Sequence, residues 1–170
     1  MHNLCMKNDH SLIHTLDRYD TALLTAVQQD AQTTHAQLGE KVSLSASQVS
    51  RRIQRLEASG VIERTVALLS PERLGLGVRA ISYVTLSRHG GDEGPGFERA
   101  VRDIPEVVEC FAVTGESDYI LKIFAADLQT LSESVLKRLT RLPGVAAIRS
   151  NIVLQCVKST SALPMTHLTH

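Results

Sequence analysis

Tryptophan is absent from the 170-residue sequence, and aromatic residues make up only 4% of it. A stacking platform for single-stranded nucleic acid needs several aromatic rings, so this class of binding protein is disfavoured. Cysteine is also scarce, because Cys5, Cys110 and Cys156 lie far apart, are odd in number and form no CxxC pair. We therefore expect neither a disulfide framework nor a cysteine zinc site, and the expected compartment is a reducing cytoplasm.

The chain has no excess of charge of either sign. Lys plus Arg and Asp plus Glu each number 18, so any contact with nucleic acid must come from a local patch rather than a bulk positive field. No apolar run approaches the length of a membrane-spanning helix, and we expect no membrane partner. The composition, 43% hydrophobic and 21% charged, is typical of a folded globular protein, and the length favours two small domains.

The first third of the sequence carries three helix-start signals. They follow a polar leader over residues 1–15, which we expect to be flexible. The expected N-caps are Asp17, Thr34 and Ser45, and a glutamine three residues after each of the last two completes a capping-box spacing. We therefore predict three helices between Asp17 and Gly60.

The second and third predicted helices are close in sequence. Only Ser43-Leu44-Ser45 separates them, which is the length of the turn in helix-turn-helix units. Residues 16–62 are therefore predicted to form a winged-type helix-turn-helix domain. The β-forming residues that follow, broken by a proline and two glycines, predict a linker strand and hinge over residues 63–77.

One face of the third helix gathers polar and basic side chains. Away from its inward stripe lie the candidates for contact with double-stranded DNA, which are Ser45, Ser47, Gln48, Arg51, Arg52 and Arg55. Hydroxyls and an amide can reach base edges, and arginines can bind guanines or phosphates. In the alternative interpretation the arginines form a solvated face and Gln48 only closes the capping box. Three arginines within five residues favour DNA.

Beyond residue 78 the predicted order of elements is β-α-β-β-α-β. Strands are expected at residues 78–87, 107–114, 118–125 and 145–157, helices at 97–104 and 128–142, and a glycine-rich loop at 89–96. This order is the ferredoxin-like arrangement, an α+β fold with both helices on one face of a four-stranded sheet. We place this domain at residues 78–158 and expect an uncharged tail over residues 159–170.

The predicted strands are apolar on both faces. In the strand at 107–114, Val107 and Phe111 alternate with Val108 and Cys110. Since a monomer would expose one such face to water, we expect the helix-free face to pack against a second copy of the chain.

No pattern typical of catalysis or metal binding occurs. The sequence has no GxSxG elbow and no phosphate-binding glycine motif, and the one helical histidine spacing, His10 to His14, lies in the leader. We therefore expect no enzymatic activity, no metal and no cofactor.

A turn containing two acids joins the second and third predicted strands. In a structural interpretation, Gly115 supplies a positive φ, Ser117 and Asp118 satisfy turn amides, and Tyr119 packs. In a functional interpretation, the turn backbone and Asp118 bind the charged ends of a small zwitterion. The residues alone favour the structural interpretation.

Residues 16–158 resemble the leucine-responsive regulator family, Lrp/AsnC. The resemblance is carried by Leu16-Asp17-Arg18-Tyr19-Asp20, Val42-Ser43-Leu44-Ser45, residues 52–62, 67–71 and 108–119, and Leu142-Pro143-Gly144-Val145. It implies a DNA-binding domain followed by a domain that binds an amino acid effector and forms dimers, often octamers. The implied role is control of amino acid metabolism or transport, and an architectural DNA-binding protein with little effector response is the alternative.

The resemblance also implies an effector site near a G-[DE]-x-D turn. That pattern is complete here, so the functional interpretation of the turn becomes the stronger one. The expected effector-binding residues are Gly115, Glu116, Ser117, Asp118, Tyr119, Asn151 and Val153, the last two from a neighbouring dimer.

Overall fold

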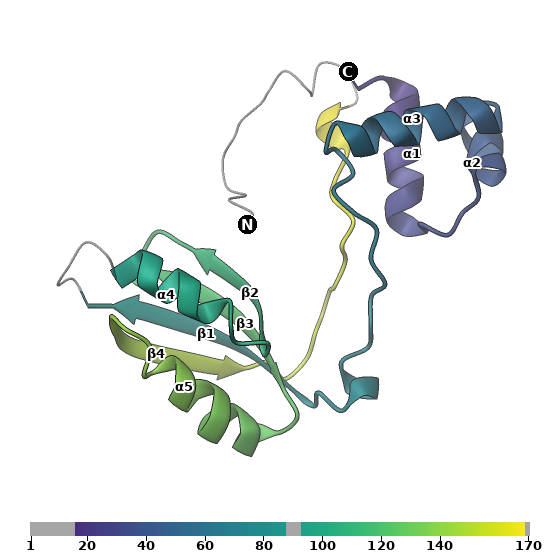
Figure 1. Ribbon diagram of the computed structural model, residues 1–170. Coiled ribbons are helices and arrows are strands. Elements are labelled where there is room, and N and C mark those ends of the chain that lie inside the picture. The colour runs from purple at the N-terminus through teal and green to yellow at the C-terminus, as the bar shows by residue number, and fades with distance from the viewer. Residues whose placement is uncertain (1–15, 88–92, 169–170) are drawn as a thin grey trace. The chain divides into compact units, whose positions relative to one another are not determined.

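The computed structural model describes residues 16–87 and 93–168, which form two compact units (Figure 1). Unit 1 comprises the chain up to Ala67 together with the segment from Lys158 onward, and unit 2 comprises Leu68–Val157. The predicted leader and residues 89–92 of the predicted glycine-rich loop lie outside the described residues.

Unit 1 contains the three predicted helices, α1 (Arg18–Gln29), α2 (His35–Val42) and α3 (Ala46–Ala58). Each begins after its predicted N-cap, because Asp17, Thr34 and Ser45 all accept hydrogen bonds from backbone N–H groups of the first turn. All three starts are capping boxes, and in α1 the partner of the N-cap is an aspartate, Asp20. The apolar faces of the helices meet in a core around Leu23, Leu38 and Val49.

Gly39 allows α2 to approach the turn before α3 closely. Its carbonyl accepts the N–H of Leu44 at 2.9 Å, and Ser43 between them has a left-handed conformation with φ of 57°. A Cβ on Gly39 would lie 2.3 Å from the carbonyl oxygen of Leu44. The helix-turn-helix geometry therefore requires glycine here, although the sequence analysis did not single this position out.

The linker strand predicted after α3 does not form in the single chain. Residues 63–70 are exposed and belong to no helix or strand, and no strand is present in the described part of unit 1. The β-forming composition is there, but a strand needs a hydrogen-bonded partner strand, and this segment pairs with none among the residues that the structure describes.

The predicted C-terminal tail is part of unit 1 and contacts α1. Leu163 donates its N–H to Oε1 of Gln28 at 2.6 Å, and Nε2 of Gln28 donates back to the Leu163 carbonyl at 3.3 Å. A short 3-10 helix, η4 (Thr166–Leu168), follows. The segment predicted as an uncharged tail is thus held to α1 by a single glutamine that bonds both backbone groups of Leu163, a contact that the sequence does not reveal.

Unit 2 is the predicted four-stranded antiparallel sheet. Its strands β1 (Val78–Leu86), β2 (Val107–Ala112), β3 (Tyr119–Ala125) and β4 (Val145–Ile152) pair in the order β2-β3-β1-β4. Helix α4 (Glu93–Val101) follows β1. A π-helical stretch, η3 (Thr130–Leu136), continued by α5 (Lys137–Leu139), follows β3. The β-α-β-β-α-β order is confirmed (Figure 1).

The predicted boundaries in unit 2 differ most from the structure at the start of α4 and at the end of β4. Helix α4 begins at Glu93 rather than Phe97, since a proline is tolerated in a first turn whose N–H groups have no intrahelical partner. Strand β4 ends at Ile152 rather than Val157, because its partner β1 begins at Val78 and pairs Ala80 with Ile152. Among the described residues, no helix has the length and apolar character to cross a membrane.

The two faces of the sheet differ in character. The face covered by the helices holds a buried core that includes Ala80, Val84, Leu121 and Ile123, together with Phe97, Leu131, Val135 and Leu139 from the helices. On the other face, Phe111 pairs with Ile120, and cations lie over aromatic rings, with Arg79 4.9 Å from the Phe124 ring. This face is therefore a mixture of apolar and charged side chains rather than uniformly apolar.

Candidate DNA-binding face and effector pocket

A buried carboxylate joins α1 to α3. The Asp20 side chain is fully buried, its Oδ1 accepts Nη1 of Arg52 at 2.8 Å, and its Oδ2 accepts Nη2 of Arg55. Asp17 accepts the same Arg52 nitrogen at 2.8 Å. These two acids and two arginines, which we call the Asp20 cluster, are neutral in sum and hold α3 against the start of α1.

The Asp20 cluster alters the ionisation of its members. Burial raises the pKa of Asp17, but hydrogen bonds from the Asp20 N–H and the Arg52 guanidinium outweigh it, so this pKa lies below its ordinary value. The hydrogen bond to Asp20 raises the pKa of Arg52. The Arg52 guanidinium also lies 5.4 Å from the centre of the Tyr19 ring. Arg52, which was predicted to contact DNA, thus makes its ion pairs within unit 1, with Asp17 and Asp20.

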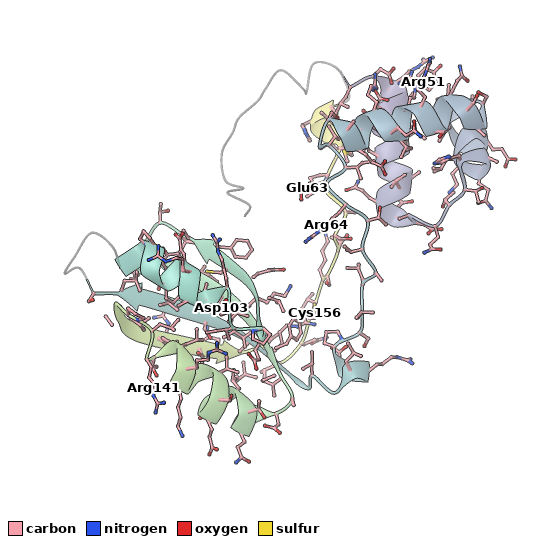
Figure 2. All side chains as sticks on the ribbon, in the orientation of Figure 1. Arg51, Glu63, Arg64, Asp103, Arg141 and Cys156 are labelled. Carbon is pink, nitrogen blue, oxygen red and sulfur yellow. The ribbon has the colours of Figure 1, made fainter. Side chains whose placement is uncertain are left out.

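The remaining predicted DNA-contacting residues divide into two groups. Ser45 and Gln48 form the capping box of α3, as in the structural interpretation of Gln48. Ser47 and Arg51 are, like Ser45 and Gln48, exposed. Figure 2 shows where Arg51 lies on α3, and it is the arginine of this helix that forms no ion pair with a described acid. The Arg55 side chain is 55% exposed although it is anchored at one end.

Gln54 belongs to the same exposed face and was missed by the sequence analysis. It is exposed and lies three residues after Arg51 and seven after Ser47, so the helical period places the three side chains together. That period was the available signal. The exposed face of α3 thus carries the Ser47 hydroxyl, which lies 3.1 Å from the Ser45 hydroxyl, the Gln54 amide and the Arg51 guanidinium, which pairs with no described acid. Arg55 lies at the edge of this face.

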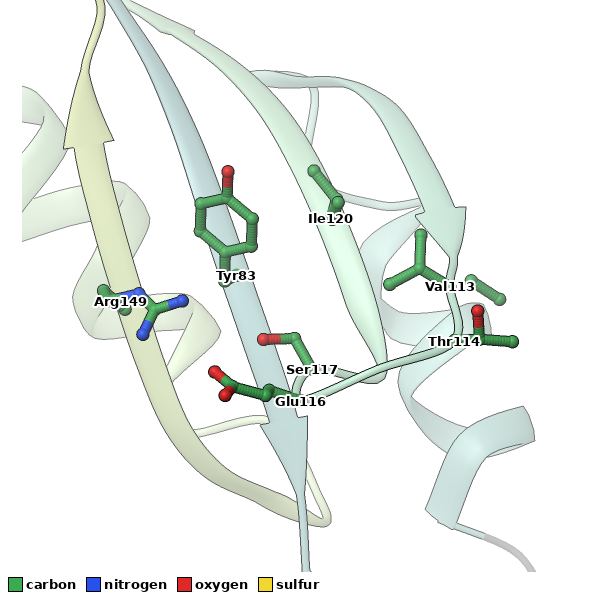
Figure 3. Close-up of a pocket in the computed structure, with 8 residues that line it drawn as sticks. Tyr83, Val113, Thr114, Glu116, Ser117, Ile120 and Arg149 are labelled. Carbon is green, nitrogen blue, oxygen red and sulfur yellow. The ribbon is translucent and has the colours of Figure 1, made fainter.

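A pocket of about 690 Å³ opens on unit 2 beside the turn between β2 and β3 (Figure 3). Its lining combines apolar, hydroxyl and oppositely charged side chains and consists of Tyr83, Ala112, Val113, Thr114, Glu116, Ser117, Ile120 and Arg149. The strands β1, β3 and β4 supply its floor through Tyr83, Ile120 and Arg149, which lie on the helix-free face of the sheet.

Opposite charges approach this pocket from two elements. Glu116 and Ser117 extend from the turn between β2 and β3 and lie over β1. They point toward β4, which carries Arg149 (Figure 3). Tyr83 is the register partner of Arg149, whose guanidinium lies 5.2 Å from the Tyr83 ring centre. A carboxylate and a guanidinium beside an apolar wall can bind the two charged ends and the side chain of a zwitterion.

The structure brings only two of the seven predicted effector-binding residues into the pocket lining, Glu116 and Ser117. Gly115 has φ of 123° and shapes the turn. Asn151 pairs with Ile81 on β1, and the Val153 N–H donates to a β1 carbonyl, so Asn151 lies farther along β4 and Val153 lies just beyond its end.

Asp118 and Tyr119 have structural contacts in the single chain. The Asp118 carboxylate accepts the N–H of Leu86 at 2.7 Å, which ties the turn to β1. Tyr119 points into the helix-covered core, where its hydroxyl donates to Glu98 at 3.0 Å and its ring lies 4.7 Å from that of Phe97. Burial, with this hydrogen bond, raises the pKa of Tyr119 to about 12.

Tyr83 and Arg149 are pocket residues that the sequence analysis missed. The alternation of side chains along each strand predicts the face of the sheet on which each residue lies. Only the pairing of β1 with β4 brings the two residues together. Among the described residues, no group of three or more histidine, cysteine, aspartate or glutamate side chains is arranged to hold a metal ion.

Comparison with known proteins matches both units to domains of the same protein family. Residues 16–57 match the AsnC-type helix-turn-helix domain, and residues 79–163 match the Lrp/AsnC ligand binding domain. The chain is 36% identical to the Bkd operon transcriptional regulator of Pseudomonas aeruginosa, over 88% of this chain and 98% of that protein. It is 34% identical to the leucine-responsive regulatory protein of Escherichia coli, over 87% and 90%.

The solved structures agree. A transcriptional regulator from Neisseria meningitidis, determined as a complex with L-Met, superposes with a TM-score of 0.87 at 40% identity, covering 91% of this chain and 99% of that one. The fold and the two units define a DNA-binding transcriptional regulator with a ligand-binding domain. The chain belongs to the Lrp/AsnC family.

Proposed function

We propose that this chain reads operator DNA through the exposed face of α3 and adjusts that binding when a free amino acid occupies the pocket of unit 2. The observation that carries the proposal is the presence of Glu116 and Arg149 in the lining of one pocket. Arg149 binds the carboxylate of the amino acid and Glu116 binds its ammonium group. The proposed compartment is the cytoplasm, and the regulated genes serve amino acid metabolism or transport.

The apolar part of the pocket selects the side chain of the effector. Val113, Ile120 and the ring of Tyr83 offer a wall for an uncharged side chain of moderate size. Two structural relatives, from Neisseria meningitidis and M. tuberculosis, were determined with L-methionine bound. We therefore propose methionine and the branched aliphatic amino acids as the first effectors to test.

Assembly of several copies completes the site in this proposal. The pocket lies on the helix-free face, which we expect to pack against a second copy in a dimer, with octamers built from dimers. A neighbouring dimer then brings Asn151 and Val153 to the ligand, while Asp118 holds the turn in place. Because the ligand would be enclosed between copies, its binding is coupled to assembly and hence to the spacing of the α3 helices.

The experiment begins with selection of bound sequences from a random duplex library by the full-length protein. Mobility-shift titrations on the selected duplex, with and without each of the twenty amino acids, then identify the effector. A changed affinity with one or a few amino acids, and none with the corresponding amide that lacks the carboxylate, supports the proposal. Binding that no amino acid alters would favour the architectural alternative.

A further inference from the structure

We propose that Asp20 is a positioning residue for DNA recognition, because its buried carboxylate fixes the Arg55 guanidinium at the edge of the exposed face of α3 and withdraws Arg52 from that face. The inference rests on the DNA-binding role proposed above for α3. It assigns three different functions to the three arginines of one helix.

The contacts of the two anchored arginines differ in kind. Arg52 is only 23% exposed in its side chain, is bound by the carboxylates of both Asp17 and Asp20, and lies near the Tyr19 ring. Arg55 is 55% exposed and contacts Asp20 through one nitrogen, Nη2. Since a guanidinium carries five N–H donors, most of those on Arg55 stay available to a ligand.

Burial makes Asp20 an unusually firm anchor. Its side chain is fully buried, and its Oδ2 also accepts the Asp17 N–H at 3.1 Å. A buried carboxylate must keep its partners, because an unpaired buried charge is strongly unfavourable. Arg55 is therefore held in one orientation before DNA arrives and loses less conformational freedom on binding than an unanchored side chain.

The fixed orientation determines what Arg55 can recognise. A planar guanidinium aimed by its anchor can form the bidentate contact to a guanine edge that discriminates between bases. Arg51 has no such anchor in the described part of the chain, and it contributes charge, which binds phosphates of any sequence. In this division, Arg55 carries sequence specificity, Arg51 carries general affinity, and Arg52 holds α3 on α1.

The test uses the full-length protein, the selected duplex and a scrambled duplex of the same composition. The measured quantity is the ratio of the two affinities, obtained by fluorescence anisotropy. Arg55→Lys keeps the charge but removes the planar fork, and we expect the ratio to fall about tenfold. Arg51→Lys, the matched change at the unanchored position, is expected to alter both affinities equally. Equal ratios in the two variants would overturn the inference.

A second pair of variants tests whether Asp20 acts through Arg55. Asp20→Asn should lower the ratio in the wild-type background and leave it unaltered when Arg55→Ala is already present. A lower melting temperature with an unaltered ratio in Asp20→Asn would make Asp20 merely structural. If Asp20→Asn does not fold, the inference is tested by the affinity ratios of Arg55→Lys and Arg51→Lys alone.

Failure of the inference can be told from failure of the proposed function. If the library yields no preferred sequence, sequence-specific DNA binding itself is refuted. A preferred sequence whose discrimination survives Arg55→Lys refutes only the positioning role.

Discussion

Arg51 is the cation of α3 whose loss should affect DNA binding with the least effect on folding. It is exposed and pairs with no described acid, so Arg51→Ala should alter the free energy of unfolding by less than about 0.5 kcal/mol. Loss of one phosphate contact should lower the slope of log affinity against log salt by about 0.9. Anisotropy titrations at several salt concentrations measure this, with the exposed Lys137→Ala in unit 2 as control.

Arg55→Ala should behave differently, because Arg55 is also a partner of the buried Asp20. It should weaken DNA binding and in addition lower the melting temperature of unit 1. Unaltered affinity for the selected duplex in both alanine variants would show that the exposed face of α3 is not the DNA-binding face.

Glu116 is the acid of the turn between β2 and β3 that lines the pocket, and Glu116→Gln should remove the charge that we propose binds the ammonium group of the effector. We expect amino acid affinity to fall at least about tenfold, corresponding to about 1.4 kcal/mol, with DNA binding retained in the absence of effector. Calorimetry on the full-length protein measures the loss. Glu133→Gln, an exposed acid on η3, is the matched control.

Asp118→Ala gives the complementary result. If its carboxylate serves the turn through the Leu86 N–H, the variant should be destabilised and its effector affinity should fall less than that of Glu116→Gln. A greater loss of affinity in Asp118→Ala would return the ammonium-binding role to Asp118.

At the scale of elements, the approach of α2 to the following turn depends on Gly39. Gly39→Ala should destabilise unit 1 by about 2 kcal/mol, because the new methyl group would meet the Leu44 carbonyl oxygen and backbone would have to shift. Gly96→Ala in α4 is the matched change in open space and should stabilise unit 2 by about 0.5 kcal/mol. Urea denaturation of both variants provides the comparison.

The packing of β3 under α4 predicts a loss of stability in alkali. Burial raises the pKa of Tyr119 to about 12, whereas an unfolded chain has a tyrosine pKa of about 10. Below pH ~10 the phenol is protonated in both states, and above it only the unfolded chain loses the proton, so stability falls by up to about 1.4 kcal/mol per pH unit until the folded pKa is reached. In the Tyr119→Phe variant, the midpoint of urea denaturation should fall less steeply as the pH rises above ~10.

Cys110 must be controlled in that experiment. Partial desolvation raises the pKa of its thiol to about 11, but Cys110 is exposed in the single chain, so solvent screens the effect and its contribution to the fall is smaller and comes at lower pH. Both proteins are therefore compared with Cys110→Ala present. An identical alkaline slope with and without the Tyr119 hydroxyl would contradict the assignment.

The predictable parts of the fold are those that depend on local chemistry. The N-caps Asp17, Thr34 and Ser45 mark helix starts because each side-chain oxygen accepts an N–H from a residue close by in the sequence. The end of β4 and the pairing of Tyr83 with Arg149 depend on register with a strand distant in sequence. The sequence therefore predicts the turn whose Glu116 lines the pocket, but it does not predict that Arg149 lines the same pocket.

At the scale of the whole molecule, the helix-free face of the sheet predicts self-association. Phe111 is 53% exposed there beside Ile120. Covering such side chains stabilises a complex by about 25 cal/mol per Å² of apolar surface. Light scattering at micromolar concentration should therefore give at least a dimeric mass, and Phe111→Asp should lower it. A monomeric mass for the wild-type chain would refute the dimer.

The contact between Gln28 and the segment around Leu163 has a consequence for connectivity. The polypeptide passes from unit 1 to unit 2 after Ala67 and returns after Val157, so two separate segments of the chain connect the units. A proteolytic cut in residues 63–67 therefore removes only one of the two covalent connections and leaves the contacts between Gln28 and Leu163 to link the fragment with α1, α2 and α3 to the rest of the chain.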